Sequence, residues 1–279
     1  MVESTFQLAR GIGPVRERQL WQSGITRWDE FPPSPEVAVS TKADRTLRAA
    51  IAEATDALAC RDADRLAALL PSGEHWRLFD AFGDDAAYLD IETSDDVVGH
   101  AGISAIGILD RHGPQLFLAG RDLARFPEAT RDWSMLVTFN GLSFDVPILR
   151  RAFPEWEPPG CHVDLRHVLA RLGHSGGLKA IERSLSTLNL ARPAHLSGLG
   201  GWDAGWLYRR GRDGDRQALR RFAEYNLYDA VNLRTLMAYA YNALVESKSA
   251  ESPALRAPCV AVPGRGDVLY DVSKILLAL

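Results

Sequence analysis

The feature that most constrains the fold is a short apolar stretch, residues 86–93, that carries two acidic side chains. Side chains alternate across a β-strand, so Tyr88, Asp90 and Glu92 share one face and the aliphatic residues between them share the other. Two carboxylates side by side on so apolar a strand repel each other and lose hydration unless a cation lies between them. The pattern therefore indicates a strand with a metal-binding face. The alternative is a strand end that runs into the polar loop after it.

Composition limits the classes of protein to consider. The chain has 279 residues, 46% of them hydrophobic and 24% charged, which is typical of a globular protein with one large domain or a domain with a smaller appendage. The formal net charge is −4, so any surface that binds nucleic acid must be local. The 3 cysteines form no C-x-x-C motif, which argues against a disulfide framework and a thiolate zinc site. Without a signal segment or a long apolar run, the sequence predicts a cytoplasmic protein.

Glycines near the N-terminus predict a tight turn in front of a helix. Gly11 and Gly13 permit the turn, Pro14 suits the first helical turn, and Gly24 ends the helix. Free backbone N–H groups at such a helix start suit a phosphate. Local positive charge comes from Arg10, Arg16 and Arg18. The pattern resembles a helix-hairpin-helix element, which grips the nucleic-acid backbone through residues such as Gly11, Gly13 and Arg16. The alternative is an ordinary helical hairpin.

The middle of the chain changes from helix to strand. Prolines predict a linker at 32–37, and an Ala-rich helix follows over 41–70. Strands are predicted at residues 86–91, 100–110, 115–119, 135–139 and 161–165, with a turn at Gly113 and Pro114 and a helix over 121–132. Three sequential strands followed by alternating helix and strand predict an α/β fold, with a mixed sheet flanked by helices.

A third acid follows the fourth strand. Gly141 lets the chain turn, Ser143 can cap the next helix, and Pro147 must lie in its first turn. Asp145 then lies at the helix start, beside the carboxyl end of the strand, where sites are commonly built. The alternative is an acid that the helix dipole favours.

A fourth acid lies on the long helix predicted over 215–242. Tyr225 and Asp229 lie one turn apart on its apolar stripe, where a carboxylate needs a partner. Neighbouring turns of the stripe offer no lysine or arginine, so a metal shared with Asp90 would supply the charge. The alternative is an arginine, either Arg234 or one from elsewhere. Lys179, near another helix start, faces an anion or solvent.

The three motifs occur in the order Asp90-x-Glu92, Asn140 to Asp145, and Tyr225 to Asp229. Together they resemble the tyrosine-bearing branch of the DEDD exonuclease superfamily on the ribonuclease H-like fold, over about residues 84–243. The closer resemblance is to the YprB-like ribonuclease H-like family. Counterparts there cover the N-terminal glycine turn, the stretch Pro71 to Trp76, the acidic strand and the Gly-Gly-Leu-Lys helix start at 176–179.

The resemblance implies a metal-dependent 3′–5′ exonuclease that acts on DNA or RNA at a single-stranded 3′ end. Two Mg²⁺ or Mn²⁺ ions would be held by Asp90, Glu92, Asp145 and Asp229, with Tyr225 completing the catalytic set. Substrate contacts are expected from Thr93, Asn140, Phe144 and Lys179. The expected domains are a helix-hairpin-helix-like element at 1–32, a helical connector at 33–83, a ribonuclease H-like exonuclease domain at 84–243, and a C-terminal tail at 244–279.

Parts of the sequence are also compatible with two other functions. A non-catalytic protein could bind nucleic acid through the N-terminal turn alone. A glycosidase could use Asp90 or Glu92 without metal, but sugar sites usually show aromatic side chains around the acids, and the tryptophans lie outside these motifs.

Overall fold

The computed structural model describes residues 1–32, 41–190, 192–263 and 275. At its centre lies a five-stranded sheet in the order β3-β2-β1-β4-β5. Strands β1, β2 and β3 are antiparallel neighbours, and β4 and β5 continue the sheet parallel to β1. The strands are β1 Ala86–Thr93, β2 Ile103–Asp110, β3 Gly113–Leu118, β4 Met135–Thr138 and β5 His162–Asp164. The predicted mixed sheet is confirmed.

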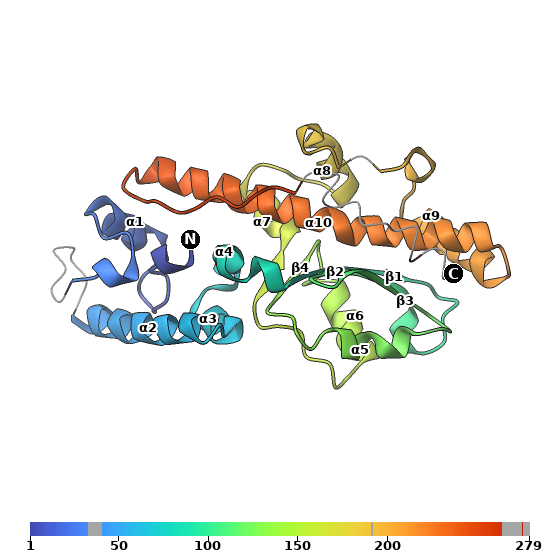
Figure 1. The fold of residues 1–279 in the computed structure, drawn as a ribbon, viewed down its shortest axis with the longest axis horizontal. Coiled ribbons are helices and arrows are strands. Elements are labelled where there is room, and N and C mark those ends of the chain that lie inside the picture. The colour runs from blue at the N-terminus through green and yellow to red at the C-terminus, as the bar shows by residue number, and fades with distance from the viewer. Residues whose placement is uncertain (33–40, 191, 264–274, 276–279) are drawn as a thin grey trace.

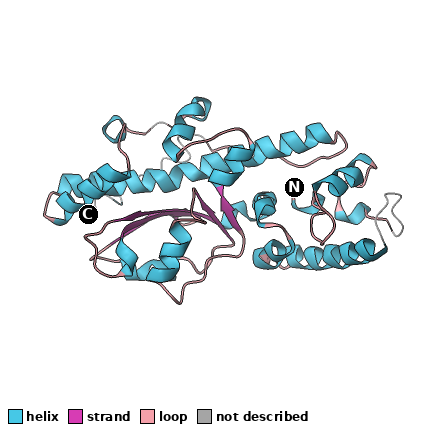
Figure 2. Ribbon diagram, turned by 180° about the vertical axis from the view of Figure 1, so that it is seen from behind, coloured by secondary structure: helices cyan, strands magenta, loops and turns pink. Residues whose placement is uncertain are grey.

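Helices cover both faces of this sheet, as Figures 1 and 2 show. The long α10 lies across one face with α9 beside it, and α5 and α6 cover the other face. Leu89 and Ile91 of β1 pack in the cluster of α5 and α6, whereas Tyr88 packs in the cluster that includes α10. The predicted alternation of side chains along β1 is therefore correct. The helices are α1 Pro14–Gln22, α2 Thr41–Ala59, α3 Ala63–Leu69, α4 Phe79–Phe82, α5 Phe126–Ala129, α6 Asp145–Ala152, α7 Leu165–Arg171, α8 Leu178–Ser184, α9 Gly201–Arg212 and α10 Arg216–Glu251.

Two strand boundaries differ from the prediction. Strand β2 begins at Ile103 rather than at residue 100, because residues 99–102 all have positive φ and form a turn. The β2–β3 hairpin turns at Arg111 and His112, not at Gly113 and Pro114, since Asp110 pairs with Gly113. Pro114 fits inside β3 because β3 is an edge strand.

The helix predicted over 41–70 is wrong as a single element. It breaks into α2 and α3 because Arg61 adopts φ 54°, and the Asp62 side chain accepts a hydrogen bond from the Arg65 N–H to cap α3. The helix predicted over 121–132 is a 3-10 turn followed by the four-residue α5. Helix α6 starts after Phe144 without a side-chain cap, so Ser143 is not its cap. Helix α10 runs to Glu251, beyond its predicted end.

The N-terminal region packs on the connector and on the end of α10. Helix α1 follows a turn at Gly11, whose φ is 95°, and a 3-10 turn at Val2–Ser4 precedes it. Glu17 of α1 is buried and receives hydrogen bonds from Arg77 of the connector. Arg18 forms an ion pair with Glu251. The predicted linker at 32–37 lies mostly outside the described residues, as does most of the tail beyond 263.

Candidate functional site

Three of the four predicted carboxylates converge between β1 and α10. Asp90, Glu92 and Asp229 each place one carboxylate oxygen within 4.8 Å of the other two. Glu92 follows Asp90 by two residues on the same face of β1, and α10 brings Asp229 over that face. Three carboxylate oxygens at this separation form the donor set that hard divalent cations such as Mg²⁺ and Mn²⁺ prefer. The residues present therefore fit a divalent metal.

A glycine on β2 allows α10 to approach the sheet at this point. Gly107 pairs with Asp90 in the sheet, and a Cβ on it would lie 2.6 Å from Oδ1 of Asn226 on α10. The Asn226 side chain donates from Nδ2 to the Asp90 carboxylate at 2.7 Å and to the Asp90 carbonyl oxygen at 3.2 Å. Asn226 therefore fixes the orientation of Asp90, and any larger residue at 107 would displace it.

The fourth carboxylate approaches β1 from α6, a helix on the face of the sheet opposite α10. Asp145 is buried at the start of α6, and its Oδ1 accepts a hydrogen bond of 3.1 Å from the N–H of Ile91. Ile91 lies between the two acids of β1, so Asp145 is tied to the backbone of the strand that carries Asp90 and Glu92. Asp145 lies outside the cluster of three.

Asp164 holds the loop that positions Asp145. Its carboxylate accepts hydrogen bonds from the N–H groups of Asn140 at 2.7 Å and Leu142 at 3.1 Å, and it also caps α7. Asn140 adopts φ 68°, and a Cβ on Gly141 would collide with Thr138. The loop between β4 and α6 is therefore fixed by β5 and by a glycine that sequence alone identifies only as a turn former.

Burial and mutual repulsion raise the pKa values of these acids. The pKa of Asp90 lies well above its usual value, because the carboxyl is desolvated and faces the charges of Asp229, Glu92 and Asp145. Desolvation and the charge of Asp229 raise the pKa of Glu92 to about 8. Desolvation raises the pKa of Asp145 to about 7, although the Ile91 N–H opposes the shift. Together the acids form a site that a cation would stabilise.

Two basic side chains partly neutralise the cluster. Arg192 places Nη2 2.5 Å from Oδ1 of Asp229, and Lys179 places Nζ 3.5 Å from its Oδ2. Asp229 is therefore paired with an arginine from elsewhere in the chain, as the alternative reading of the sequence proposed. The expectation that only a metal supplies its positive partner is wrong. The stripe of α10 could not reveal this, because Arg192 lies in the connection between α8 and α9.

Tyr225 lies beside this cluster on α10. Its hydroxyl accepts a hydrogen bond from Lys179 Nζ, which also lies 3.9 Å from the centre of the Tyr225 ring. Desolvation and the charges of Asp229, Glu92 and Asp90 raise the pKa of Tyr225. The phenol therefore stays protonated over the ordinary pH range and can donate a hydrogen bond.

The predicted substrate-contact residues differ in their surroundings. Phe144 is 40% exposed directly before Asp145, whereas Thr93 is half-buried at the end of β1. The Asn140 side chain accepts a hydrogen bond from Arg166. The predicted phosphate-binding residues lie elsewhere: Gly11, Gly13 and Arg16 belong to the N-terminal region around α1, apart from the carboxylate cluster (Figure 1).

His162 and Asp164 on β5 are metal ligands by residue type, but the structure gives both side chains protein partners. His162 shares a hydrogen bond of 2.8 Å with Thr138, and its pKa is lowered to about 4 by desolvation. Asp164 is already occupied by backbone N–H groups. This strand end therefore shapes the loop before Asp145 and offers little to an ion.

A family model of the RNase H superfamily matches residues 87–241, more than half of the chain. The chain belongs to the RNase H superfamily. Membership indicates a nuclease-type enzyme with a nucleic-acid substrate, and the acidic cluster is consistent with the divalent metals that such nucleases use. A search of curated proteins finds no match, and a search of solved structures finds none either. Among the helices in the described residues, none is long and apolar enough to cross a membrane.

Proposed function

We propose that the protein is a two-metal-dependent 3′–5′ exonuclease that hydrolyses phosphodiester bonds of DNA or RNA. The observation that carries the proposal is the convergence of Asp90, Glu92 and Asp229 beside Tyr225, on a fold of the RNase H superfamily. The order of these residues along the chain supports placing the protein in the tyrosine-bearing DEDD branch and its YprB-like family. A single-stranded 3′ end is the proposed substrate.

Each residue of the site has a proposed role. Asp90, at the centre, would be the ligand shared by two ions, with Glu92, Asp145 and Asp229 as the remaining ligands. When bound, Mg²⁺ or Mn²⁺ would supply the positive charge that activates water and stabilises the leaving oxygen. Glu92 and the Tyr225 hydroxyl would orient the attacking water by hydrogen bonds. Contacts to the strand would come from Thr93, Asn140, Phe144 and Lys179.

The N-terminal glycine turn is proposed to hold the backbone of the same substrate. Gly11 is exposed, and Arg16 follows on the first turn of α1. This proposal divides the chain into the binding element at 1–32, the connector at 33–83, the exonuclease domain at 84–243 and the tail at 244–279. The alternative, a protein that binds nucleic acid without cutting it, predicts binding that depends on Gly13 and survives loss of Asp90.

The decisive experiment follows the shortening of single-stranded DNA and RNA labelled at the 5′ end. With Mg²⁺ or Mn²⁺ we expect a ladder of products shortened from the 3′ end, and none with EDTA or with Asp90→Asn. Asp95→Asn is the matched control, because Asp95 is an exposed acid five residues further along the chain and outside the cluster. Absence of cleavage of both substrates with both metals would contradict the proposal.

A further inference from the structure

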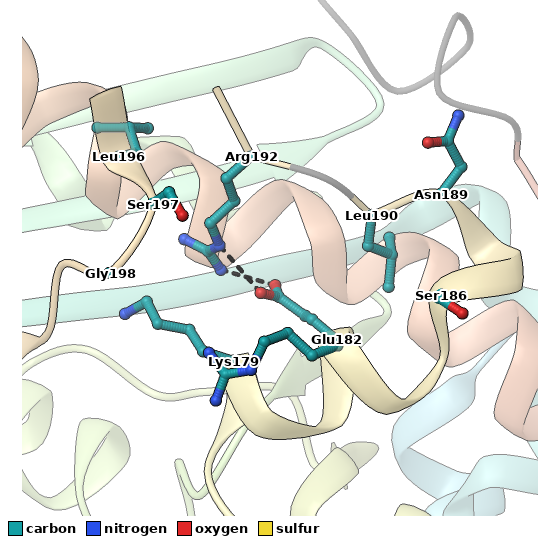
Figure 3. Close-up of a pocket in the computed structure, with 10 residues that line it drawn as sticks. Lys179, Glu182, Ser186, Asn189, Leu190, Arg192, Leu196, Ser197 and Gly198 are labelled. Carbon is teal, nitrogen blue, oxygen red and sulfur yellow. Dashed lines mark hydrogen bonds and ion pairs between the residues drawn. The ribbon is translucent and has the colours of Figure 1, made fainter. Parts of the chain in front are cut away.

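A pocket of about 370 Å³ opens directly beside the carboxylate cluster, between α8 and the connection that follows it. Figure 3 shows Arg192 reaching from this connection toward Glu182 on α8, with Lys179 on the same side of the helix. The wall includes the apolar Leu190 and Leu196 and the polar Asn189 and Ser197. A volume of this size, with apolar walls and a few polar groups, is typical of a small-ligand site.

Arg192 points an unused donor group into this region. Its Nε and Nη2 bind the Glu182 carboxylate at 2.9 Å and 2.6 Å, and Nη2 also lies against Asp229. The side chain is only 8% exposed, and its Nη1 has no hydrogen-bond partner among the described residues. Because buried donors are normally paired, the two N–H groups of Nη1 call for a ligand with acceptor oxygens.

The charge of the pocket favours an anion. Lys179, Arg183 and Arg192 line it together with the carboxylate of Glu182. Asp229, which pairs with Lys179 and Arg192, lies next to it, so three basic groups face two acidic ones. Glu182 is occupied by Arg192 and by the side chain of Asn232, which donates to it at 2.8 Å. Arg183 has no acidic partner within the part of the chain that the structure describes, so its charge is available to a ligand.

We propose that this pocket binds the phosphate group of a nucleotide, with Nη1 of Arg192 and the side chain of Arg183 as its donors. The apolar wall and the amide of Asn189 would take the sugar or base. The inference rests on the proposed nuclease activity for the source of the phosphate, which is either the released mononucleotide or a phosphodiester of the bound strand. Arg192 also contacts Asp229, so a phosphate held there would lie next to the candidate metal ligands.

The test measures equilibrium binding in EDTA, by calorimetry, so that turnover plays no part. The probes are adenosine 5′-monophosphate, adenosine, and a single-stranded oligonucleotide without terminal phosphates. We expect at least one of the two phosphate probes, adenosine 5′-monophosphate or the oligonucleotide, to bind. If the monophosphate binds, adenosine should bind at least tenfold more weakly. Binding of the monophosphate identifies the released product as the source, and binding of the oligonucleotide alone identifies the strand.

The variants assign that binding to the pocket. Arg192→Lys keeps a positive charge beside Glu182 but removes Nη1, and Arg183→Gln removes an exposed charge that the fold does not need. Each is expected to weaken phosphate binding about tenfold or more, whereas Arg220→Gln, an exposed arginine outside the pocket, is expected to leave it unchanged. Thermal melting checks that the variants are folded.

The proposal is overturned if no phosphate probe binds the wild-type protein, if adenosine binds as well as its monophosphate, or if folded Arg192→Lys and Arg183→Gln both bind like the wild type. A protein without nuclease activity could still bind phosphate in this assay, because the binding measurement needs neither metal nor cleavage. The two proposals therefore fail in different experiments.

Discussion

The molecule buries two groups of charged side chains, and they are built in opposite ways. In the N-terminal region, Arg77 is fully buried between two acids, with Nη2 2.9 Å from Glu17 and Nε 2.5 Å from Glu74. Glu17 also receives hydrogen bonds from Thr5, Phe6 and Gln7. In the site, by contrast, acids face acids, and only Asp229 among them has basic partners in Lys179 and Arg192. Desolvation, with repulsion from the neighbouring carboxylates, raises the pKa values of Asp90 and Glu92.

The difference separates a charge-balanced cluster from the one in which we propose a metal site. Opposite charges that satisfy each other hold the N-terminal region on the connector. Like charges gathered at one strand edge cost stability, which a bound cation would recover. The imbalance of charge therefore supports the proposed metal site, and four measurements test the contrast between the two clusters.

The largest effect is expected from Arg77→Met. The change leaves the Glu17 carboxylate buried without its partner, which should lower the free energy of unfolding by about 3–5 kcal/mol. Urea denaturation measures this loss. The double variant Glu17→Met with Arg77→Met removes both charges and should recover most of it; a single variant as stable as the wild type would contradict the structural role of the pair.

The opposite behaviour is expected from Glu92→Gln. It removes one repelling charge, so the metal-free protein should melt at the same temperature or higher, while nuclease activity should fall about 10²–10³-fold through loss of a metal ligand. Melting curves and rates of oligonucleotide cleavage test both parts. A variant that loses stability as Arg77→Met does would show that the two clusters are alike.

Metal addition is the third comparison. Ions that bind only the folded protein should stabilise it by about 2.7 kcal/mol at a concentration of 100 Kd. Thermal unfolding with increasing Mg²⁺ or Mn²⁺ measures the effect, which Asp90→Asn should abolish and Asp95→Asn should preserve. If Asp90→Asn is stabilised as much as the wild type, the ion binds elsewhere.

The last comparison concerns pH. The folded pKa values of Glu92, about 8, and Asp145, about 7, lie above those of the unfolded chain, so the folded protein binds more protons between about pH 4 and 8. The metal-free protein should therefore lose stability as pH rises through this window, which thermal melting measures as a falling Tm. The double variant Glu92→Gln with Asp145→Asn should show a flatter profile, and an unchanged slope would contradict the assignment.

Much of the fold and part of the site follow from local sequence. Strand alternation places Asp90 and Glu92 on one face, and helical spacing places Tyr225 with Asp229, because both patterns depend only on neighbouring residues. The space that Gly107 leaves for the Asn226 side chain depends instead on which β2 residue pairs with Asp90. Arg192 lies in a connection without periodicity, and the break at Arg61 interrupts an Ala-rich segment that favours helix throughout. Such features are set by tertiary contacts, which local patterns do not encode.

Helix α10 has a mechanical consequence. Its 36 residues carry Tyr225 and Asp229 in one half and, at Glu251, an ion pair to α1. At 1.5 Å per residue, about 39 Å of rigid rod separates Tyr225 from Glu251. The length of α10 thus sets the distance between the N-terminal region and the carboxylates. A single residue inserted between 232 and 244 would lengthen the rod only slightly, but it would rotate one end against the other by about 100°.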